Sequence, residues 1–146
     1  MTFLPRSPKT PKEFESYFNL RYEVLRKPWG QALGSERDQL EDSAFHAMIW
    51  DENLGAVAVC RLQKNNDETG QIRYMAVHPD FRGKGLGKII LEYTEKVGLE
   101  MGLKKINLQA REKAVAFYNS NGYMLVKKSH LLYGEVQHYE MSKNLI

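Results

Sequence analysis

The residues best suited to chemistry lie together in the middle of the chain, where residues 82–88 read RGKGLGK. The segment follows a strand-like run, residues 71–77, and opens a helical pattern. Glycines let ligand oxygens reach the main chain, and the N–H groups and dipole of a helix N-terminus both favour an anion. Arg82, Lys84 and Lys88 add positive charge beside them. The segment therefore predicts a binding site for an anionic group of a small ligand.

Two familiar phosphate-binding motifs do not describe this segment. A nucleotide P-loop requires a glycine where Arg82 stands and a serine or threonine where Ile89 follows Lys88. A dinucleotide fingerprint, G-x-G-x-x-G, requires its third glycine at Lys88 or at Ile90. A helix start with incidental glycines and solvated cations is the plainer alternative, although each glycine would then cost about 0.5–1 kcal/mol of chain entropy with no compensating contact.

The bulk composition indicates one globular domain spanning residues 1–146, since the chain is 42% hydrophobic and 27% charged. A net charge of +3 is too small to indicate nucleic-acid binding. One cysteine, Cys60, and four scattered histidines offer neither a disulfide nor metal-ligand spacing, so we expect no metal. No apolar run approaches the ~20 residues that span a bilayer, and no signal-peptide core is present. We therefore expect a cytoplasmic protein that does not bind a membrane.

The elements that position the glycine-rich segment follow from hydrophobic periodicity. We expect a first helix that Pro8 and Pro11 introduce and that Pro28, Trp29 and Gly30 end, with Phe14, Tyr17, Phe18, Arg21, Tyr22 and Leu25 at helical spacing. We expect a second helix that begins at Leu86 and is ended by Gly102, and a third from Arg111 to Ser120. We expect strands at residues 2–5, 44–50, 56–62, 71–77, 106–108, 123–126, 131–133 and 136–141. The apolar stripe of the second helix consists of Leu86, Ile89, Ile90, Tyr93, Val97 and Met101, with Glu95 on the polar face. This order predicts an α/β layer structure with a mixed sheet.

Two segments of the chain resemble motifs of the Gcn5-related N-acetyltransferase (GNAT) family. Residues 82–87 match the acyl-coenzyme A signature Q/R-x-x-G-x-G/A and follow the expected hydrophobic-Val-x-Pro element at residues 75–79. Residues 114–123, AVAFYNSNGY, resemble the family segment A-x-x-F-Y-x-x-x-G-F/Y. The resemblance extends from about residue 44 to the C-terminus, and residues 20–24 and 134–141 further resemble the ElaA-like branch of the family.

The resemblance implies a single-domain α/β (α+β) fold with a mixed, mostly antiparallel central sheet flanked by helices. It implies acetyl-CoA as co-substrate, with the pantetheine arm on main-chain groups of Met75 and Val77 and the pyrophosphate on the amides of residues 83–88. The cofactor-binding residues implied are Met75, Ala76, Val77, Arg82, Gly83, Lys84, Gly85, Leu86, Gly87, Lys88 and Arg111. Arg111 stands where the family often has asparagine, and this longer cation could instead reach a phosphate or an acceptor carboxylate.

The resemblance also implies an acid that protonates the departing thiolate. Tyr118 matches the family position of this acid, and a tyrosine with an ordinary pKa of ~10 is protonated at neutral pH. The alternative is a core aromatic, because Tyr118 shares a helical face with Ala114.

The general base is less evident. Many family members carry a glutamate on the strand that here reads Gln71-Ile72-Arg73-Tyr74, and this chain has none there. His138 could accept a proton directly or through water, or could be a structural histidine. An acidic stretch could attract a cationic amine or could be a solvated loop; it comprises Glu36, Asp38, Glu41 and Asp42.

The first helix and the residues that follow it resemble the acceptor wall of GNAT proteins. Arg21, Tyr22 and Trp29, with Arg26, could hold a small acceptor that bears a carboxylate, or could simply belong to a half-buried amphipathic helix. We expect an N-acetyltransferase that acts directly on a primary amine of a small molecule or peptide. The alternative is a catalytically weak acyl-CoA-binding sensor. Acceptor identity and a homodimeric state stay open.

Overall fold

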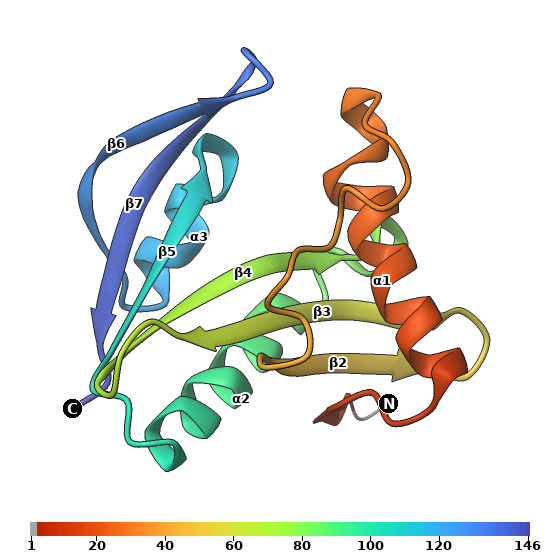
Figure 1. The fold of residues 1–146 in the computed structure, drawn as a ribbon, viewed down its shortest axis with the longest axis horizontal. Coiled ribbons are helices and arrows are strands. Elements are labelled where there is room, and N and C mark those ends of the chain that lie inside the picture. Colours follow the sequence, from red (N-terminus) through yellow and green to blue (C-terminus); the bar gives the residue numbers. More distant parts are fainter. Residues whose placement is uncertain (1–2) are drawn as a thin grey trace.

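The structure is a computed structural model that describes residues 3–146, and it is built on one seven-stranded sheet (Figure 1). The sheet order is β1-β2-β3-β4-β5-β7-β6, and every neighbouring pair is antiparallel except β4 and β5. The strands are β1 (Pro5–Arg6), β2 (Phe45–Asp51), β3 (Gly55–Lys64), β4 (Thr69–Val77), β5 (Lys105–Arg111), β6 (Met124–Leu132) and β7 (Val136–Asn144). The predicted mixed, mostly antiparallel sheet is thereby confirmed.

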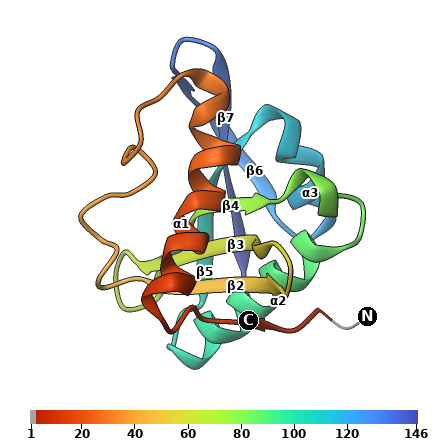
Figure 2. The same cartoon turned by 90° about the vertical axis from the view of Figure 1, so that its right-hand side faces the viewer.

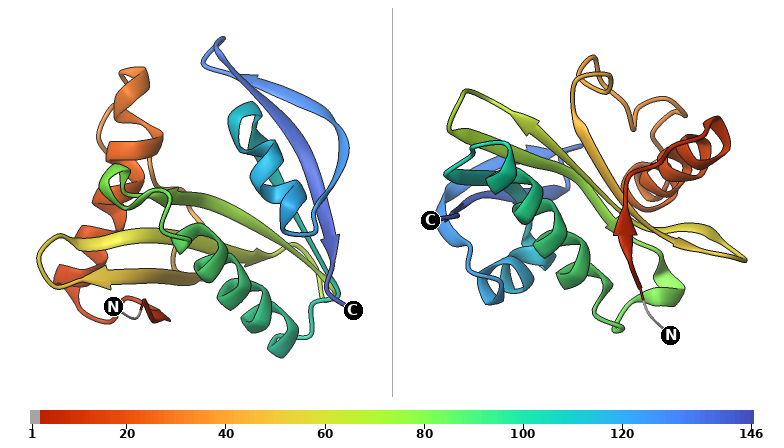
Figure 3. Two further views of the ribbon diagram at one scale, coloured as in Figure 1. Left: turned by 180° about the vertical axis from the view of Figure 1, so that it is seen from behind. Right: turned by 90° about the horizontal axis from the view of Figure 1, so that it is seen from below.

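Helices cover both faces of the sheet, as the views from behind and from below show (Figure 3). The helices are α1 (Pro11–Leu25), α2 (Leu86–Glu100) and α3 (Val115–Ser120). Helix α1 packs its aromatic side chains on the face that presents Met48 and Val59, whereas α2 packs on the face that presents Ala47 and Cys60. Because side chains alternate along a strand, successive residues of β2 and β3 mostly enter different cores, although Val57 and Ala58 of β3 enter the same one. The sheet therefore separates two hydrophobic cores.

Helix α1 begins where its prolines predict and ends at Leu25, a few residues before the predicted end at residues 28–30. Thr10 is the N-cap, and its Oγ1 accepts a hydrogen bond from the N–H of Glu13 at 3.1 Å, with Pro11 at the first helical position. The helix ends at Leu25 and a short 3₁₀ turn follows, closed by Gly30 at φ +67°. This places the C-terminal end of α1 at the same end of the molecule as the turn between β6 and β7 (Figure 2).

The parallel strands β4 and β5 part from each other halfway along their length. They pair only from Thr69–Lys105 to Ile72–Leu108, and beyond this point the strands diverge into a V-shaped opening (Figure 1). Strand β4 has one residue more than β3 between the pairs Arg61–Arg73 and Val59–Ala76, and Tyr74 within it has φ +55°. This bulge bends β4 away from β5, so the β5-facing edge of β4 after Ile72 has no strand partner.

The predicted C-terminal elements differ in detail from those observed. The strands expected at 123–126 and 131–133 form one irregular strand, β6, because two register shifts against β7 let the chain continue through the polar residues between them. The third predicted helix is a 3₁₀ turn (Glu112–Ala114) followed by α3, and Arg111 belongs to the end of β5. The first strand is Pro5–Arg6 rather than 2–5, and Thr2 lies outside the described residues.

Helix α2 buries a face that is rotated from the predicted stripe. Leu86 and Ile90 are buried as expected, but Thr94 and Glu95 are also buried, whereas Tyr93 is only half-buried. Glu95 is 8% exposed, and its carboxylate pairs with Lys143 Nζ of β7 at 2.9 Å. The prediction that Glu95 lies on the solvent face was wrong because an ion pair from a distant strand compensates its burial.

Candidate active site

The glycine-rich segment connects β4 to α2 through a 3₁₀ turn, and two of its glycines are required by backbone conformation. Gly83 has φ +77° and Gly85 has φ +80°, in the left-handed region that other residues rarely adopt. Gly85 is the N-cap of α2 and offers no side chain to cap it, and the first turn of α2 contains no acidic residue. The first N–H groups of α2 therefore remain available to an external acceptor.

Other residues of this segment divide between ligand-facing and packing positions. Arg82, Lys84 and Lys88 are exposed and surround the helix N-terminus with positive charge. Leu86 is 1% exposed, so only its backbone can face a ligand. A Cβ on Gly87 would lie 3.1 Å from Cζ of Phe117, so this glycine lets α2 pack against α3. The arrangement suits a diphosphate held by main-chain groups and side-chain cations together.

We expect Gly85→Leu to weaken CoA binding at least tenfold while the protein stays folded, because the new side chain would cover the N–H groups of α2. A Cβ at Gly85 meets nothing within 4 Å, so the fold has room for it, and the left-handed backbone adds a strain of about 1 kcal/mol. Gly102→Leu is the matched control, because Gly102 follows the other end of α2 with φ +87° and an equally open surrounding. Calorimetric titration with CoA should separate the two variants, and equal losses would contradict the assignment.

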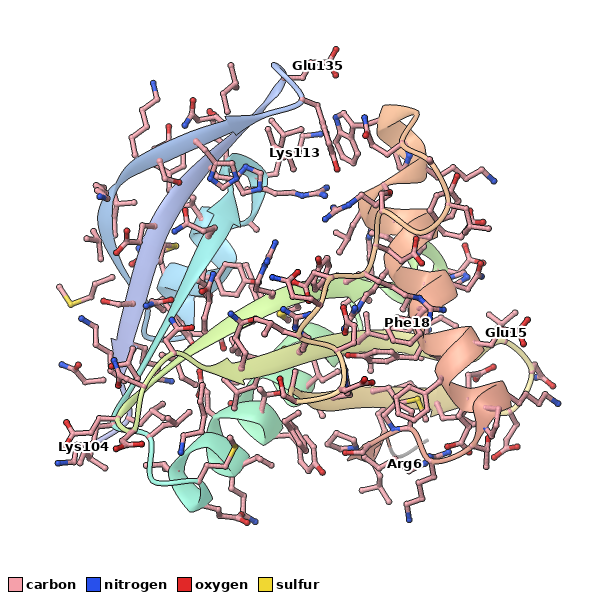
Figure 4. The ribbon with its side chains drawn as sticks, in the orientation of Figure 1. Arg6, Glu15, Phe18, Lys104, Lys113 and Glu135 are labelled. Carbon is pink, nitrogen blue, oxygen red and sulfur yellow. The ribbon has the colours of Figure 1, made fainter. Side chains whose placement is uncertain are left out.

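A cavity of about 240 Å³ lies in the opening between β4 and β5. Its walls come from the C-terminal end of α1, from β4 and β5, from α3 and from the β6–β7 hairpin; they comprise Leu25, Arg26, Gln71, Ile72, Arg73, Tyr74, Met75, Leu108, Gln109, Ala110, Arg111, Ala114, Tyr118, His130, Leu132 and His138. Side chains from both arms of the opening reach toward each other across it, and Glu135 at the hairpin tip points away (Figure 4). Met75, Tyr118, Arg111 and His138 are thus brought together, as a reaction site requires.

Tyr118 lines the cavity and is 8% exposed. Its hydroxyl donates a hydrogen bond to Met75 Sδ at 3.3 Å, a weak acceptor that leaves the proton transferable. Burial raises the pKa of Tyr118 well above its ordinary value, and the nearby Arg111 opposes this only in part. The hydroxyl is therefore protonated throughout the neutral range.

His138 lies on β7 opposite Arg111 of β5, and its ring stacks on that of His130 of β6 at 4.3 Å. Its Nδ1 lies 2.9 Å from the carbonyl oxygen of Val136, and a carbonyl can only accept, so Nδ1 carries the proton and Nε2 bears a lone pair. Burial lowers the pKa of His138 below its ordinary value, and His130 and Arg111 lower it further. His138 is thus a neutral imidazole at the cavity wall.

The structure does not bring Arg21 to the cavity. Arg21 is fully buried, and its guanidinium donates to Glu41 Oε2 at 2.9 Å and to the hydroxyl of Tyr17 at 2.9 Å. These partners use the charge of Arg21 within the protein, so it cannot reach an acceptor. Tyr22 lines no part of the cavity, and Trp29 contributes indirectly, through the guanidinium of Arg111 that lies 4.5 Å from its ring.

Within the acidic stretch, Asp38 and Glu41 are neither solvated nor free to attract an amine, whereas Asp42 is exposed. Asp38 and Glu41 both bind Arg61, whose Nη1 lies 2.7 Å from Asp38 Oδ1 and 2.9 Å from Glu41 Oε2. The bonds to Arg61 hold the pKa of Asp38 at about 2. Because these carboxylates neutralise Arg61 and Arg21, the loop that contains them is fastened across the sheet and their charge is already compensated.

Tyr74, which sequence reasoning did not single out, organises this region. Its ring centroid lies within cation–π distance of Arg21 (4.3 Å), Arg61 (4.9 Å), Arg73 (4.9 Å) and Arg26 (5.4 Å). These stacked guanidiniums hold the residue at the bulge of β4 in its unfavourable positive-φ conformation. A positive φ at a tyrosine leaves no trace in the sequence, so only the folded chain shows this position.

Two parallel strands that part beside an uncapped helix N-terminus, with a buried tyrosine in the opening, define an acyltransferase of the GNAT class. The family model described as Acetyltransferase (GNAT) family matches residues 14–123. The chain belongs to this family and is a GNAT-type N-acetyltransferase, so the resemblance read from the two sequence motifs is confirmed.

Known proteins of this class resemble the chain over nearly its whole length. The chain is 27% identical over 136 residues to an uncharacterized N-acetyltransferase of Bacillus subtilis, YjcF. The alignment covers 93% of this chain and 96% of that protein. The structure of Escherichia coli ElaA shares the fold with a TM-score of 0.81 at 19% identity, over 98% of this chain and 100% of that one. An aminoglycoside 6'-N-acetyltransferase solved with coenzyme A has a TM-score of 0.82 at 15% identity. The superposition covers 100% of this chain and 98% of that one.

Residues 3–146 offer neither a membrane-spanning helix nor a group of metal ligands. None of the helices there is both long and apolar enough to cross a membrane. Within the same residues, no three histidine, cysteine or acidic side chains are grouped as metal ligands.

Proposed function

We propose that this acetyltransferase uses acetyl-CoA and transfers the acetyl group directly to a primary amine of a small molecule or peptide. The observation that carries the proposal is the parting of β4 and β5 beside the uncapped N-terminus of α2, with Tyr118 in the wall of the cavity between the strands. The coenzyme A complex of a protein with the same fold supports the choice of cofactor.

In this proposal the cofactor crosses the opening from the glycine-rich segment to the cavity. The amides of residues 83–88 hold the pyrophosphate, with Arg82, Lys84 and Lys88 around it. Main-chain groups of Met75, Ala76 and Val77 lie along the part of β4 that β5 leaves unpaired, where an extended pantetheine arm can add as a further strand. The thioester then reaches Tyr118.

The chemistry needs a neutral amine, a polarised thioester and a proton for the leaving thiolate. The amine nitrogen attacks the thioester carbon, the C–S bond breaks, and the sulfur takes the proton of the Tyr118 hydroxyl. The nitrogen loses a proton as the amide forms, and His138 Nε2 is the acceptor that we propose for it, directly or through water. Tyr118 then takes a proton from solvent and His138 releases one to solvent, so both residues return to their starting protonation states.

The proposed role of His138 predicts a pH dependence. Because its pKa lies below the ordinary value of 6.5, the ring stays unprotonated in neutral solution. Once kcat/KM is corrected for the neutral fraction of the amine at each pH, it should fall only as the pH drops below about 6.5. His138→Gln should lower kcat/KM by about 10²-fold at pH 7 and remove this acidic limb. A variant that keeps the wild-type pH profile would show that His138 is only structural. Rates measured between pH 5 and 9 decide between the two.

The second candidate function is a catalytically weak acyl-CoA-binding sensor. It is favoured by the stretch Gln71–Tyr74, which carries no glutamate where many family members have one. Thiol release from acetyl-CoA over a panel of primary amines, with calorimetric titration of CoA alongside, tests both functions. Turnover of at least one amine supports the enzyme, whereas tight cofactor binding without turnover of any amine supports the sensor.

A further inference from the structure

The cavity between β4 and β5 is lined by cationic groups without acidic ones. Arg26, Arg73 and Arg111 contribute guanidiniums to its wall, and no aspartate or glutamate is among its lining residues. None of the residues of the glycine-rich segment, 82–88, lines it. The cavity and the proposed pyrophosphate site are therefore separate positive regions, and the positive charge of the cavity has a different use.

The guanidiniums of Arg26 and Arg111 converge on one carbonyl group. Arg26 Nη1 and Arg111 Nη2 each donate to the carbonyl oxygen of Leu25 at 3.1 Å, and Arg26 Nε donates to that of Ser35 at 3.0 Å. Among residues 3–146, neither arginine forms an ion pair with a carboxylate. Two like charges thus meet at a single neutral acceptor.

The contrast with the other arginines of this region shows that the pair is unusual. Arg21 and Arg61 are buried and share the carboxylate of Glu41, and Arg73 reaches Asp38 Oδ2 at 3.2 Å. A partly buried charge is costly without a counter-charge, and two neighbouring ones repel each other. Consistent with this, burial and the charge of Arg26 lower the pKa of Arg111.

The pair is also held in place and keeps donors free. The Arg111 guanidinium lies 4.5 Å from the ring centroid of Trp29, and that of Arg26 lies 5.4 Å from the ring centroid of Tyr74. Within the described chain, Arg26 Nη2 and Arg111 Nε and Nη1 donate no hydrogen bond. Stacked guanidiniums with free N–H groups are a preorganised receptor for the oxygens of a carboxylate or phosphate.

We infer that the acceptor amine carries an anionic group, a carboxylate or a phosphate, which Arg26 and Arg111 bind in the cavity between β4 and β5. The inference rests on the proposed function, because it takes this cavity to be the acceptor site. The anion supplies the counter-charge that the two arginines lack, and its placement fixes the amine relative to the thioester. A cavity of about 240 Å³ suits a small acceptor of this kind.

Binding of product analogues to the CoA-loaded protein tests the inference without relying on turnover. The probes are N-acetylglycine, its neutral amide N-acetylglycinamide, and N-acetyl-2-aminoethyl phosphate. Since Trp29 stacks on Arg111, its fluorescence in a Trp50→Phe background reports occupancy beside the pair. We expect at least one anionic probe to bind tenfold or more tightly than the amide, and the stronger one identifies the group. Equal affinities, or no binding of any probe, would overturn the inference.

Variants show whether the two arginines are responsible. Arg26→Met and Arg111→Met should each reduce the preference for the anionic probe at least tenfold, and Arg111→Lys should retain part of it. Arg37→Met is the matched control, because Arg37 does not line the cavity and pairs with Glu36 at 3.4 Å, and it should leave the preference unchanged. CoA affinity, measured in parallel, confirms that each variant is folded. If Arg111→Met lowers CoA affinity instead and leaves the preference intact, Arg111 serves the cofactor and the inference is wrong.

The outcomes separate this inference from the proposed function. Acetylation of neutral amines together with equal affinity for charged and uncharged probes would overturn the inference and leave the acetyltransferase proposal standing. Tight binding of an anionic probe without turnover of any amine would support the anion site and contradict the proposed transfer reaction.

Discussion

Tyr118→Phe is expected to lower kcat by about 10²- to 10⁴-fold while CoA affinity changes little. The substitution removes only the hydroxyl that we propose protonates the thiolate. In the folded protein this hydroxyl makes one weak bond, to Met75 Sδ at 3.3 Å, so its loss should leave the fold intact. The ring keeps its edge-to-face contacts with Phe117 and Tyr123. Steady-state kinetics and calorimetric titration with CoA measure the two effects.

Tyr123→Phe is the control for this experiment. Tyr123 packs 5.7 Å from Tyr118, centroid to centroid, and is fully buried, but it does not line the cavity. Its hydroxyl lies beside the Glu95 carboxylate and outside the cavity wall, so removing it should leave kcat unchanged. A Tyr118→Phe enzyme with wild-type kcat, or an equal loss in both variants, would refute the acid role of Tyr118.

Arg61→Met is expected to lower the free energy of unfolding by about 3 kcal/mol, the low end for breaking a buried ion pair. Arg61 is fully buried and binds Asp38 and Glu41 at the same time. Removing it leaves two largely buried carboxylates with less positive charge, although Glu41 keeps Arg21 and Asp38 keeps Arg73. Urea denaturation followed by circular dichroism measures the loss.

Arg73→Met is the matched control, since Arg73 also pairs with Asp38 but through a side chain that is 42% exposed. This substitution should lower the free energy of unfolding by less than about 1 kcal/mol.

The pH dependence of stability gives a second check. The pKa of Asp38 is lowered from 3.8 to about 2, so its stabilising effect is present above pH 3.8 and is lost as the pH falls toward 2. Arg61→Met should weaken this acid sensitivity. Equal losses of stability in Arg61→Met and Arg73→Met would show that the buried ion pairs of Arg61 with Asp38 and Glu41 do not fasten the loop that carries these carboxylates.

The sequence by itself determined the features that depend on neighbouring residues. The proline and glycine boundaries of α1, the strand before the glycine-rich segment and the helix after it follow from backbone preferences that act over a few residues. The anion-binding character of residues 82–88 was predictable for the same reason, since glycine conformation and the helix dipole are local properties. The position of Tyr118 followed from a motif, and in the structure Tyr118 lines the cavity.

Only the tertiary structure decided which charges are available. Arg21 and Arg26 lie in or just after the same helix and look equivalent in the sequence, yet Glu41 neutralises Arg21 and no carboxylate pairs with Arg26 among residues 3–146. Arg111 meets the carbonyl of Leu25 across a separation of 86 residues, and Glu95 is compensated by Lys143, 48 residues away. A charge is stabilised or left unpaired by whatever group lies within a few ångströms of it, and folding rather than chain order sets that distance.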